Sequence, residues 1–103
     1  MDCVYIPHGC DTAIYRPIDQ REAREVTGIP QDRFVVGMVA ANKGNPSRKA
    51  FQQQIEAFAM LKRKRKRKDA LLYLHTIKAE MGENQGVNLP ELLAYNGLEQ
   101  GKD

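Results

Sequence analysis

The chain has 103 residues, of which 42% are hydrophobic and 28% are charged, and this composition is typical of one globular domain at most. No uncharged stretch approaches the roughly 20 apolar residues that span a bilayer, and the N-terminal residues lack the basic and apolar regions of a secretory signal, so we expect a cytoplasmic protein. The net charge of +3 conceals one unbroken run of seven cations, Lys62 to Lys68, and acidic residues outnumber basic ones in the rest of the chain.

The first 18 residues are interpreted as a connector, because prolines, a glycine and an aspartate interrupt every short apolar piece. Asp19 followed three residues later by Glu22 is typical of a helix N-terminus, and Gly28 is typical of a helix end. The pattern therefore predicts a helix over residues 20–27. The main domain is expected to cover residues 19–103.

Two apolar runs predict the strands of a parallel sheet. The run from Phe34 to Ala41 is rich in β-branched residues and has no polar alternation, which is typical of a strand buried on both faces. The run from Ala70 to Ile77 is the second strand. A helix is expected between them, with Ser47 as its N-cap and Arg48 as its first residue.

The expected helix between the strands has one apolar face. Phe51, Ile55 and Phe58 recur at helical spacing, so this face should pack against the sheet and complete a right-handed βαβ unit. A short third helix is expected over residues 89–95, capped by Asn88 and ended by Asn96 and Gly97. Because the apolar face of the last helix needs a sheet of more than two strands to cover it, the fold class is interpreted as an incomplete α/β domain, part of a larger protein. The alternative is a natural mini-domain with a sheet of two or three strands, which would have to be stable on a small core.

The polar loop from Asn42 to Ser47 follows the end of the first strand, where parallel α/β proteins place ligands. Cations at Arg48 and Lys49 would oppose the dipole of a helix that began there, and a bound phosphate would relieve this conflict. The alternative is that both are solvated surface residues. Neither the G-x-x-x-x-G-K-[ST] nor the G-x-G-x-x-G pattern is present, so any nucleotide is held in another way.

Several segments together resemble group 1 retaining glycosyltransferases of the GT-B type, which have two Rossmann-like domains. The resemblance runs along nearly the whole chain, and its order and spacing make it fairly specific. The segments that carry it are Ile6-Pro7-His8-Gly9-Cys10-Asp11-Thr12, Tyr15-Arg16-Pro17, Val35-Val36-Gly37-Met38-Val39, Asn42, Arg48-Lys49, Ile55-Glu56-Ala57-Phe58, Leu72-Tyr73-Leu74-His75-Thr76 and Leu89-Pro90-Glu91-Leu92-Leu93.

The resemblance implies a partial Rossmann-like sheet in which residues 1–18 are the interdomain connector and residues 19–103 open the nucleotide-sugar-binding domain. It implies that Arg48 and Lys49, which match the family's R-K-G element, bind the diphosphate of a UDP or GDP sugar, and that Gly37 and Asn42 border this site. Two departures stand out: Ala50 replaces the usual glycine, and Met38 stands where the family has an arginine.

The resemblance also implies what this chain lacks. The acceptor-binding domain and the acidic E-x7-E element lie outside the matched region, so the chain alone is expected to be inactive and no catalytic residue is assigned. His75, at the end of the second strand, could border the donor site or be held by the backbone alone. The acceptor, a glycan, a lipid or a small molecule, would be bound by the domain that is missing here.

The seven-cation run supports three interpretations that the sequence leaves open: a solvated helix end, a surface for nucleic acid, or a contact with an anionic membrane. No aromatic residues interleave the run to stack on bases, so nucleic-acid binding is the alternative function and not the leading one. Cys3, His8 and Cys10 fall one ligand short of a structural zinc site, so no metal is expected, and no cofactor is expected either.

Overall fold

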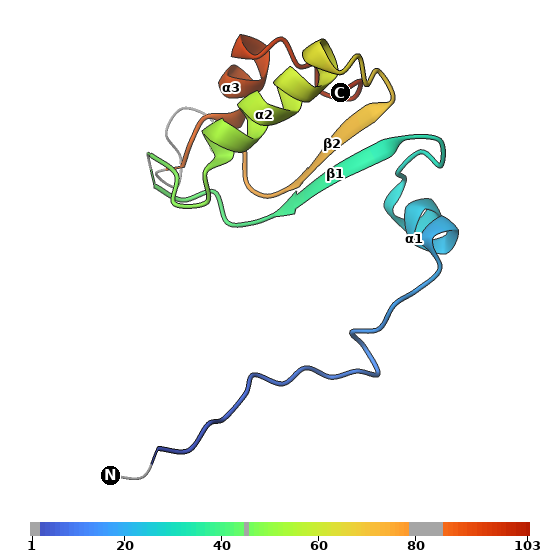
Figure 1. Ribbon diagram of the computed structural model, residues 1–103, viewed down its shortest axis with the longest axis vertical. Helices are drawn as coiled ribbons and strands as arrows, with labels where there is room; N and C mark the ends of the chain where they lie inside the picture. Colours follow the sequence, from blue (N-terminus) through green and yellow to red (C-terminus); the bar gives the residue numbers. More distant parts are fainter. Residues whose placement is uncertain (1–2, 45, 79–85) are drawn as a thin grey trace. The chain divides into compact units, whose positions relative to one another are not determined.

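The order of elements is helix, strand, helix, strand, helix, as the sequence predicts. The computed structural model describes residues 3–44, 46–78 and 86–103. Within these residues the elements are α1 (Gln20–Thr27), β1 (Phe34–Val39), α2 (Phe51–Lys64), β2 (Ala70–His75) and α3 (Leu89–Tyr95), shown in Figure 1. The chain divides into two compact units, Met1–Gln31 and Asp32–Asp103. The boundary expected at residue 18 stays a prediction.

The first unit holds the connector and α1. Asp11 closes a turn by accepting hydrogen bonds from the backbone of residues 13–15. The carboxylate of Asp19 accepts from the backbone amides of Arg21 and Glu22, and Gly28 ends the helix with a left-handed φ of 73°. Both ends of α1 thus lie where the sequence predicts them, because capping signals are local and need no tertiary contact.

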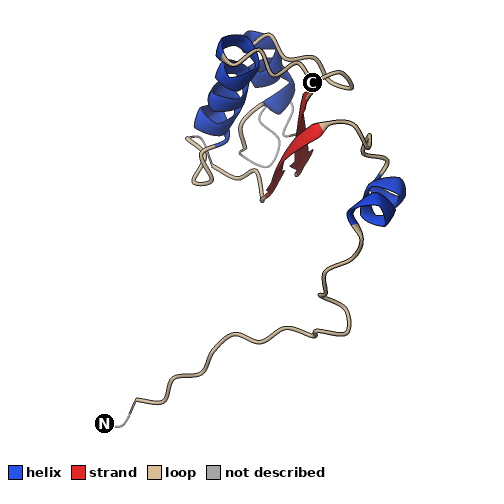
Figure 2. Cartoon of the chain, turned by 45° about the vertical axis from the view of Figure 1, so that its right-hand side comes forward, coloured by secondary structure: helices blue, strands red, loops and turns tan. Residues whose placement is uncertain are grey.

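The second unit is built on a parallel sheet, which in the described residues has two strands. Phe34 lies opposite Ala70 and Val39 opposite His75, so the strands pair in register over their whole length. The prediction that β1 is buried on both faces is wrong: the side chains of Phe34 and Val39 are 46% and 77% exposed. The reason is that α2 and α3 cover only one face of the strands (Figures 1 and 2).

The core lies between that face and the two helices. Phe51 and Ile55 of α2 are fully buried together with Leu89 of α3, and Met38 and Leu74 pack against them from the strands. Phe58 and Ala59 are buried as well. The predicted apolar face of α2 is therefore confirmed, and the second unit is a small mixed α/β fold.

The expected start of α2 is wrong. The helix begins at Phe51, not at Arg48, and its N-cap is Ala50, which has a left-handed backbone with φ 55° and no side-chain cap. Residues 46–49 form a turn of their own, closed by a hydrogen bond of 3.0 Å from the Ala50 amide to the Ser47 carbonyl. The left-handed residue separates this turn from the helix, because one residue in that conformation cannot continue an α-helix.

The strands also end two residues earlier than expected, at Val39 and His75. Helix α3 agrees with its prediction: Asn88 caps it by accepting from the Glu91 amide at 3.2 Å, and it ends at Tyr95. Gly97 follows with φ 69°, the left-handed conformation that favours glycine.

Candidate functional site

The loop that follows β1 leads into α2 at the carboxyl ends of the two parallel strands. Residue 45 of this loop is outside the described residues. Arg48 and Lys49 are exposed in the turn that precedes Ala50, and neither side chain forms a hydrogen bond or an ion pair with another described residue. Two cations without a partner among the described residues therefore stand together just before the N-terminus of α2.

The start of α2 offers backbone hydrogen-bond donors beside these cations. The first helical bond on this side runs from the Gln54 amide to the Ala50 carbonyl. No described group accepts from the amides of residues 51–53, which carry the positive end of the helix dipole. Since Arg48 and Lys49 precede the helix, they do not occupy its first turn as expected, but they still lie next to it in the chain.

Asn42 is almost fully buried, and its side chain joins the loop after β1 to both ends of the connection between β2 and α3. Its Nδ2 donates to the carbonyls of Ile77 at 3.0 Å and Val87 at 2.7 Å, and its Oδ1 accepts from the Val87 amide at 2.9 Å. Only 1% of the residue is exposed. The structure thus gives Asn42 a supporting position under the loop, in which both side-chain amide protons are hydrogen-bonded. Contact between Asn42 and a nucleotide sugar stays a prediction.

Gly37 lies inside β1, opposite Tyr73, and not in the loop. A Cβ at this position would meet no atom within 4 Å, so the backbone makes no close approach that requires glycine in the described structure. Met38, which stands where the resembling family has an arginine, points to the helical face and packs against the core. The structure therefore places Asn42, Arg48 and Lys49 in the connection between β1 and α2, and Gly37 in the strand before it, as the sequence predicts. The role of Gly37 at a donor site stays a prediction.

A hollow of about 500 Å³ opens at the carboxyl ends of both strands, and the sequence alone did not indicate it. It is lined by Val39, Ala40, Ala41, Leu74, His75, Thr76 and Ile77. His75 borders this hollow, and its Nδ1 lies 3.4 Å from the Tyr73 hydroxyl. Open α/β sheets bind ligands at the carboxyl ends of their parallel strands, so this hollow lies at the expected end of the sheet.

Three cations of the run from Lys62 to Lys68 have partners elsewhere in the fold. Lys62 forms a largely buried ion pair with Asp103, and the guanidinium of Arg63 donates to the Asn96 carbonyl at 3.2 Å. Arg67 makes a two-pronged pair with Asp69, at 2.9 and 2.8 Å, and its guanidinium lies 4.6 Å from the centre of the Phe34 ring.

The ion pair between Arg67 and Asp69 shifts the pKa of both side chains. The hydrogen bond and the charge of Asp69 raise the pKa of Arg67, and the hydrogen bond from Arg67 lowers the pKa of Asp69. The remaining cations of the run form no ion pair with a described residue, and they are Lys64, Arg65, Lys66 and Lys68.

Some kinds of site find no support in the part of the chain that the structure describes. No three His, Cys, Asp or Glu side chains gather there as candidate metal ligands. None of the helices there has the length and apolar content to cross a membrane. Comparison of the chain with protein families, with curated proteins and with solved structures found no match.

Proposed function

We propose that this chain is the first part of the donor-binding domain of a nucleotide-sugar-dependent glycosyltransferase, with a partial Rossmann-like sheet. Arg48 and Lys49 bind the diphosphate of a UDP or GDP sugar, and the complete enzyme transfers the sugar to an acceptor hydroxyl. Retention of configuration follows from the family resemblance alone.

The observation that carries the proposal is the backbone of Ala50. The resembling family has an R-K-G element at residues 48–50, and Ala50 has φ 55°, in the left-handed region that glycine adopts without strain. At residue 50 the chain therefore has alanine in place of the family's glycine, but its backbone has the left-handed conformation that glycine favours. A turn of this shape presents the two cations directly before the free amides of α2.

The chemistry of this loop suits a leaving diphosphate. Nucleotide-sugar transfer releases a diphosphate whose negative charge grows in the transition state, and preorganised cations and amide donors stabilise such charge. Arg48 offers a planar fork of donors and Lys49 a compact point charge. The hollow beside Val39 and His75 provides space at the same end of the sheet. Neither residue transfers a proton or attacks the sugar, so their role is binding and charge stabilisation.

Titration calorimetry with UDP and GDP tests the proposal. The double variant Arg48→Ala with Lys49→Ala should weaken binding about tenfold or more, since hydrogen bonds to charged groups contribute about 1.5–3 kcal/mol each. The matched control is Lys64→Ala with Arg65→Ala, which removes the same charge from the other end of α2. Equal weakening in both variants, or no diphosphate binding by the unmodified chain, would contradict the proposal.

The alternative, a basic module that binds nucleic acid through Lys62 to Lys68, has less support. Three of its seven cations are engaged within the fold, which leaves a smaller surface for phosphates than the sequence suggests. A short duplex DNA in the same titration distinguishes the two. Binding that is lost in the Lys64 and Arg65 variant, and kept in the Arg48 and Lys49 variant, would favour the module.

A further inference from the structure

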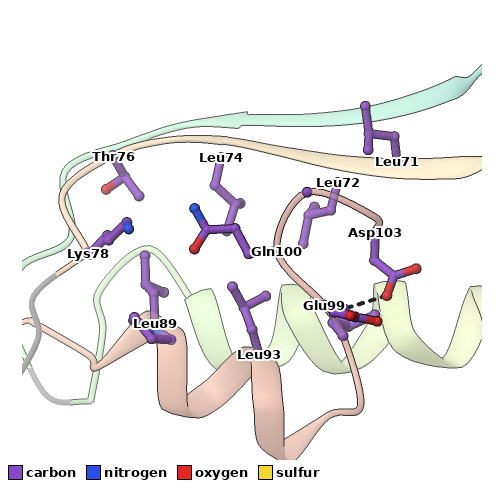
Figure 3. Close-up of a pocket in the computed structure, with 13 residues that line it drawn as sticks. Leu71, Leu72, Leu74, Thr76, Lys78, Leu89, Leu93, Glu99, Gln100 and Asp103 are labelled. Atoms are coloured by element: carbon purple, nitrogen blue, oxygen red, sulfur yellow. Dashed lines mark hydrogen bonds between the residues drawn. The ribbon is translucent and has the colours of Figure 1, made fainter. Parts of the chain in front are cut away.

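The run from Lys62 to Lys68 has no part in the donor-site proposal, and the fold divides its cations into two groups. Some are engaged within the second unit. Figure 3 shows Asp103 in the groove beside β2, where its carboxylate accepts from the Glu99 amide at 2.9 Å and also pairs with the largely buried side chain of Lys62. The cations that have no ion-pair partner among the described residues are Lys64, Arg65, Lys66 and Lys68.

These unengaged cations lie together on one tight turn. Helix α2 ends at Lys64, and Lys66 has a left-handed backbone with φ 52°, which turns the chain toward β2. The Lys68 amide donates to the Lys66 carbonyl at 2.9 Å, and the Ala70 amide donates to the Arg67 carbonyl at 3.1 Å. Every side chain from residue 64 to residue 68 is exposed. The fold therefore holds a compact cluster of positive charge in a defined turn.

Exposed apolar side chains flank this turn. Met60 is 43% exposed, and it precedes Lys64 by four positions, so the two lie on the same side of α2. Phe34 is 46% exposed, and its ring lies 4.6 Å from the guanidinium of Arg67, which Asp69 holds with two hydrogen bonds. Basic side chains beside exposed apolar ones suit the boundary between lipid headgroups and acyl chains.

The cluster lies at the opposite end of the strands from the donor loop. Phe34 pairs with Ala70 where both strands begin, and the basic turn directly precedes Ala70. Arg48 and Lys49 precede the other end of α2, whose 14 residues span about 20 Å. A surface that contacts the basic turn therefore leaves the donor loop open.

We propose that the turn of residues 64–68 docks this protein on an anionic lipid bilayer, with Met60 and Phe34 entering the headgroup region. A cluster of about four to eight basic residues is enough for such attraction. Lipid headgroups move in the plane of a bilayer and can gather under a compact cluster, whereas a duplex holds its phosphates along a rod and is bound by basic residues spread over a face.

The aromatic ring also favours lipid over nucleic acid. A base that stacked on the face of Phe34 occupied by Arg67 would have to displace that guanidinium, which Asp69 holds in place. Entry of the exposed part of the ring into a headgroup layer needs no such displacement. The proposal uses no residue of the donor loop, so it stands whether or not that loop binds a diphosphate.

Co-sedimentation of the unmodified chain with lipid vesicles tests the proposal. One set of vesicles is phosphatidylcholine alone, and in the other set phosphatidylserine replaces about a quarter of it. Binding to the neutral vesicles should be about tenfold weaker or more, because the cations contribute only where the surface potential is negative. A titration with a short duplex DNA at the same salt concentration provides the comparison with nucleic acid.

Matched variants locate the contact. Lys64→Gln with Lys68→Gln should bind anionic vesicles about 30-fold more weakly, since each basic side chain near such a surface strengthens binding about fivefold. The control, Lys43→Gln with Lys78→Gln, removes the same charge from exposed positions that follow the two strands, and it should bind nearly as well as the unmodified chain. Circular dichroism verifies that both variants fold.

Met60→Gln tests the apolar part of the contact without changing the charge. The variant should bind anionic vesicles several-fold more weakly, because a polar side chain gains less from entering the headgroup region. Its affinity for duplex DNA should not change. Met60 is exposed on α2 and glutamine is a good helix former, so this variant is expected to fold.

Three outcomes would overturn the proposal. Equal weakening in the two double variants would show that net charge acts without a defined surface. Tighter binding to DNA than to anionic vesicles, unaffected by Met60→Gln, would assign the turn to nucleic acid. Equal binding to anionic and neutral vesicles would identify the turn as a solvated helix end. None of these assays contains a nucleotide, so such failures are distinct from a failure of the donor site.

Discussion

Replacing Asn42 with alanine separates a supporting role from a ligand-binding role at one residue. The substitution removes the donor to the Ile77 and Val87 carbonyls and the acceptor for the Val87 amide. Val87 is itself buried, with 6% of its surface exposed, so water does not readily replace the lost partner. We expect the variant to lose stability whether or not a nucleotide is present.

The magnitude follows from the number of bonds lost. Each hydrogen bond contributes about 0.5–1.5 kcal/mol to stability, and a buried group left without a partner is penalised by about 1–3 kcal/mol. Three bonds around a buried amide therefore suggest a loss of about 2–4 kcal/mol. Since small domains unfold with about 5–15 kcal/mol in total, such a loss is a large share of the stability.

Urea unfolding followed by far-ultraviolet circular dichroism measures this loss. The matched control is Asn88→Ala, which removes one exposed N-cap bond to the Glu91 amide and should cost about 1 kcal/mol. Asn42→Asp keeps the acceptor but places a carboxylate against two carbonyls, so its instability should lessen as the pH falls and the carboxyl protonates. A loss below about 0.5 kcal/mol for Asn42→Ala would refute the supporting role.

Two further predictions concern the ends of α2. Ala50→Gly should raise the free energy of unfolding by about 0.5–1 kcal/mol, because φ 55° is strained for alanine, and a thermal melt that shows no gain would contradict this. At the other end, burial alone would raise the pKa of Asp103, but the hydrogen bond and charge of Lys62, with a bond from the Glu99 amide, lower it. The native chain should therefore lose stability as the pH falls from about 5 toward 2, and Lys62→Met should show a smaller loss in urea titrations over that range. Identical acid profiles for the two proteins would exclude this ion pair as a source of stability.

Elements that are defined by neighbouring residues could be predicted from the sequence. Helix α1 is fixed by Asp19 and Gly28, and α3 begins at the residue after Asn88, because each cap bonds to backbone within three or four positions. The parallel pairing of β1 with β2 also agrees with the sequence, since parallel strands need a crossover connection and this connection is usually a helix. In these places local chemistry decides the structure.

Two features of the second unit could not be predicted in this way. An apolar strand sequence indicates burial but does not say what covers it, and both Phe34 and Val39 lie partly or largely exposed. The start of α2 depends on the backbone of Ala50, and alanine carries no sequence signal for a left-handed conformation. Ser47 has the chemistry of an N-cap, but its hydroxyl accepts from the Lys49 amide, inside the preceding turn.

The seven-cation run shows why a charge pattern does not by itself define a binding surface. In the sequence its members are equivalent, but the fold gives Lys62 and Arg63 partners 41 and 33 positions away, at Asp103 and Asn96. Such pairs lower the charge that the run presents to a polyanion, because an engaged cation must break its own contact before it binds a phosphate. Arg48 and Lys49 share the lack of a described ion-pair partner with Lys64, Arg65, Lys66 and Lys68, but they alone precede helix amides from which no described group accepts. This position, more than the number of cations, favours the loop before α2 as the proposed anion site.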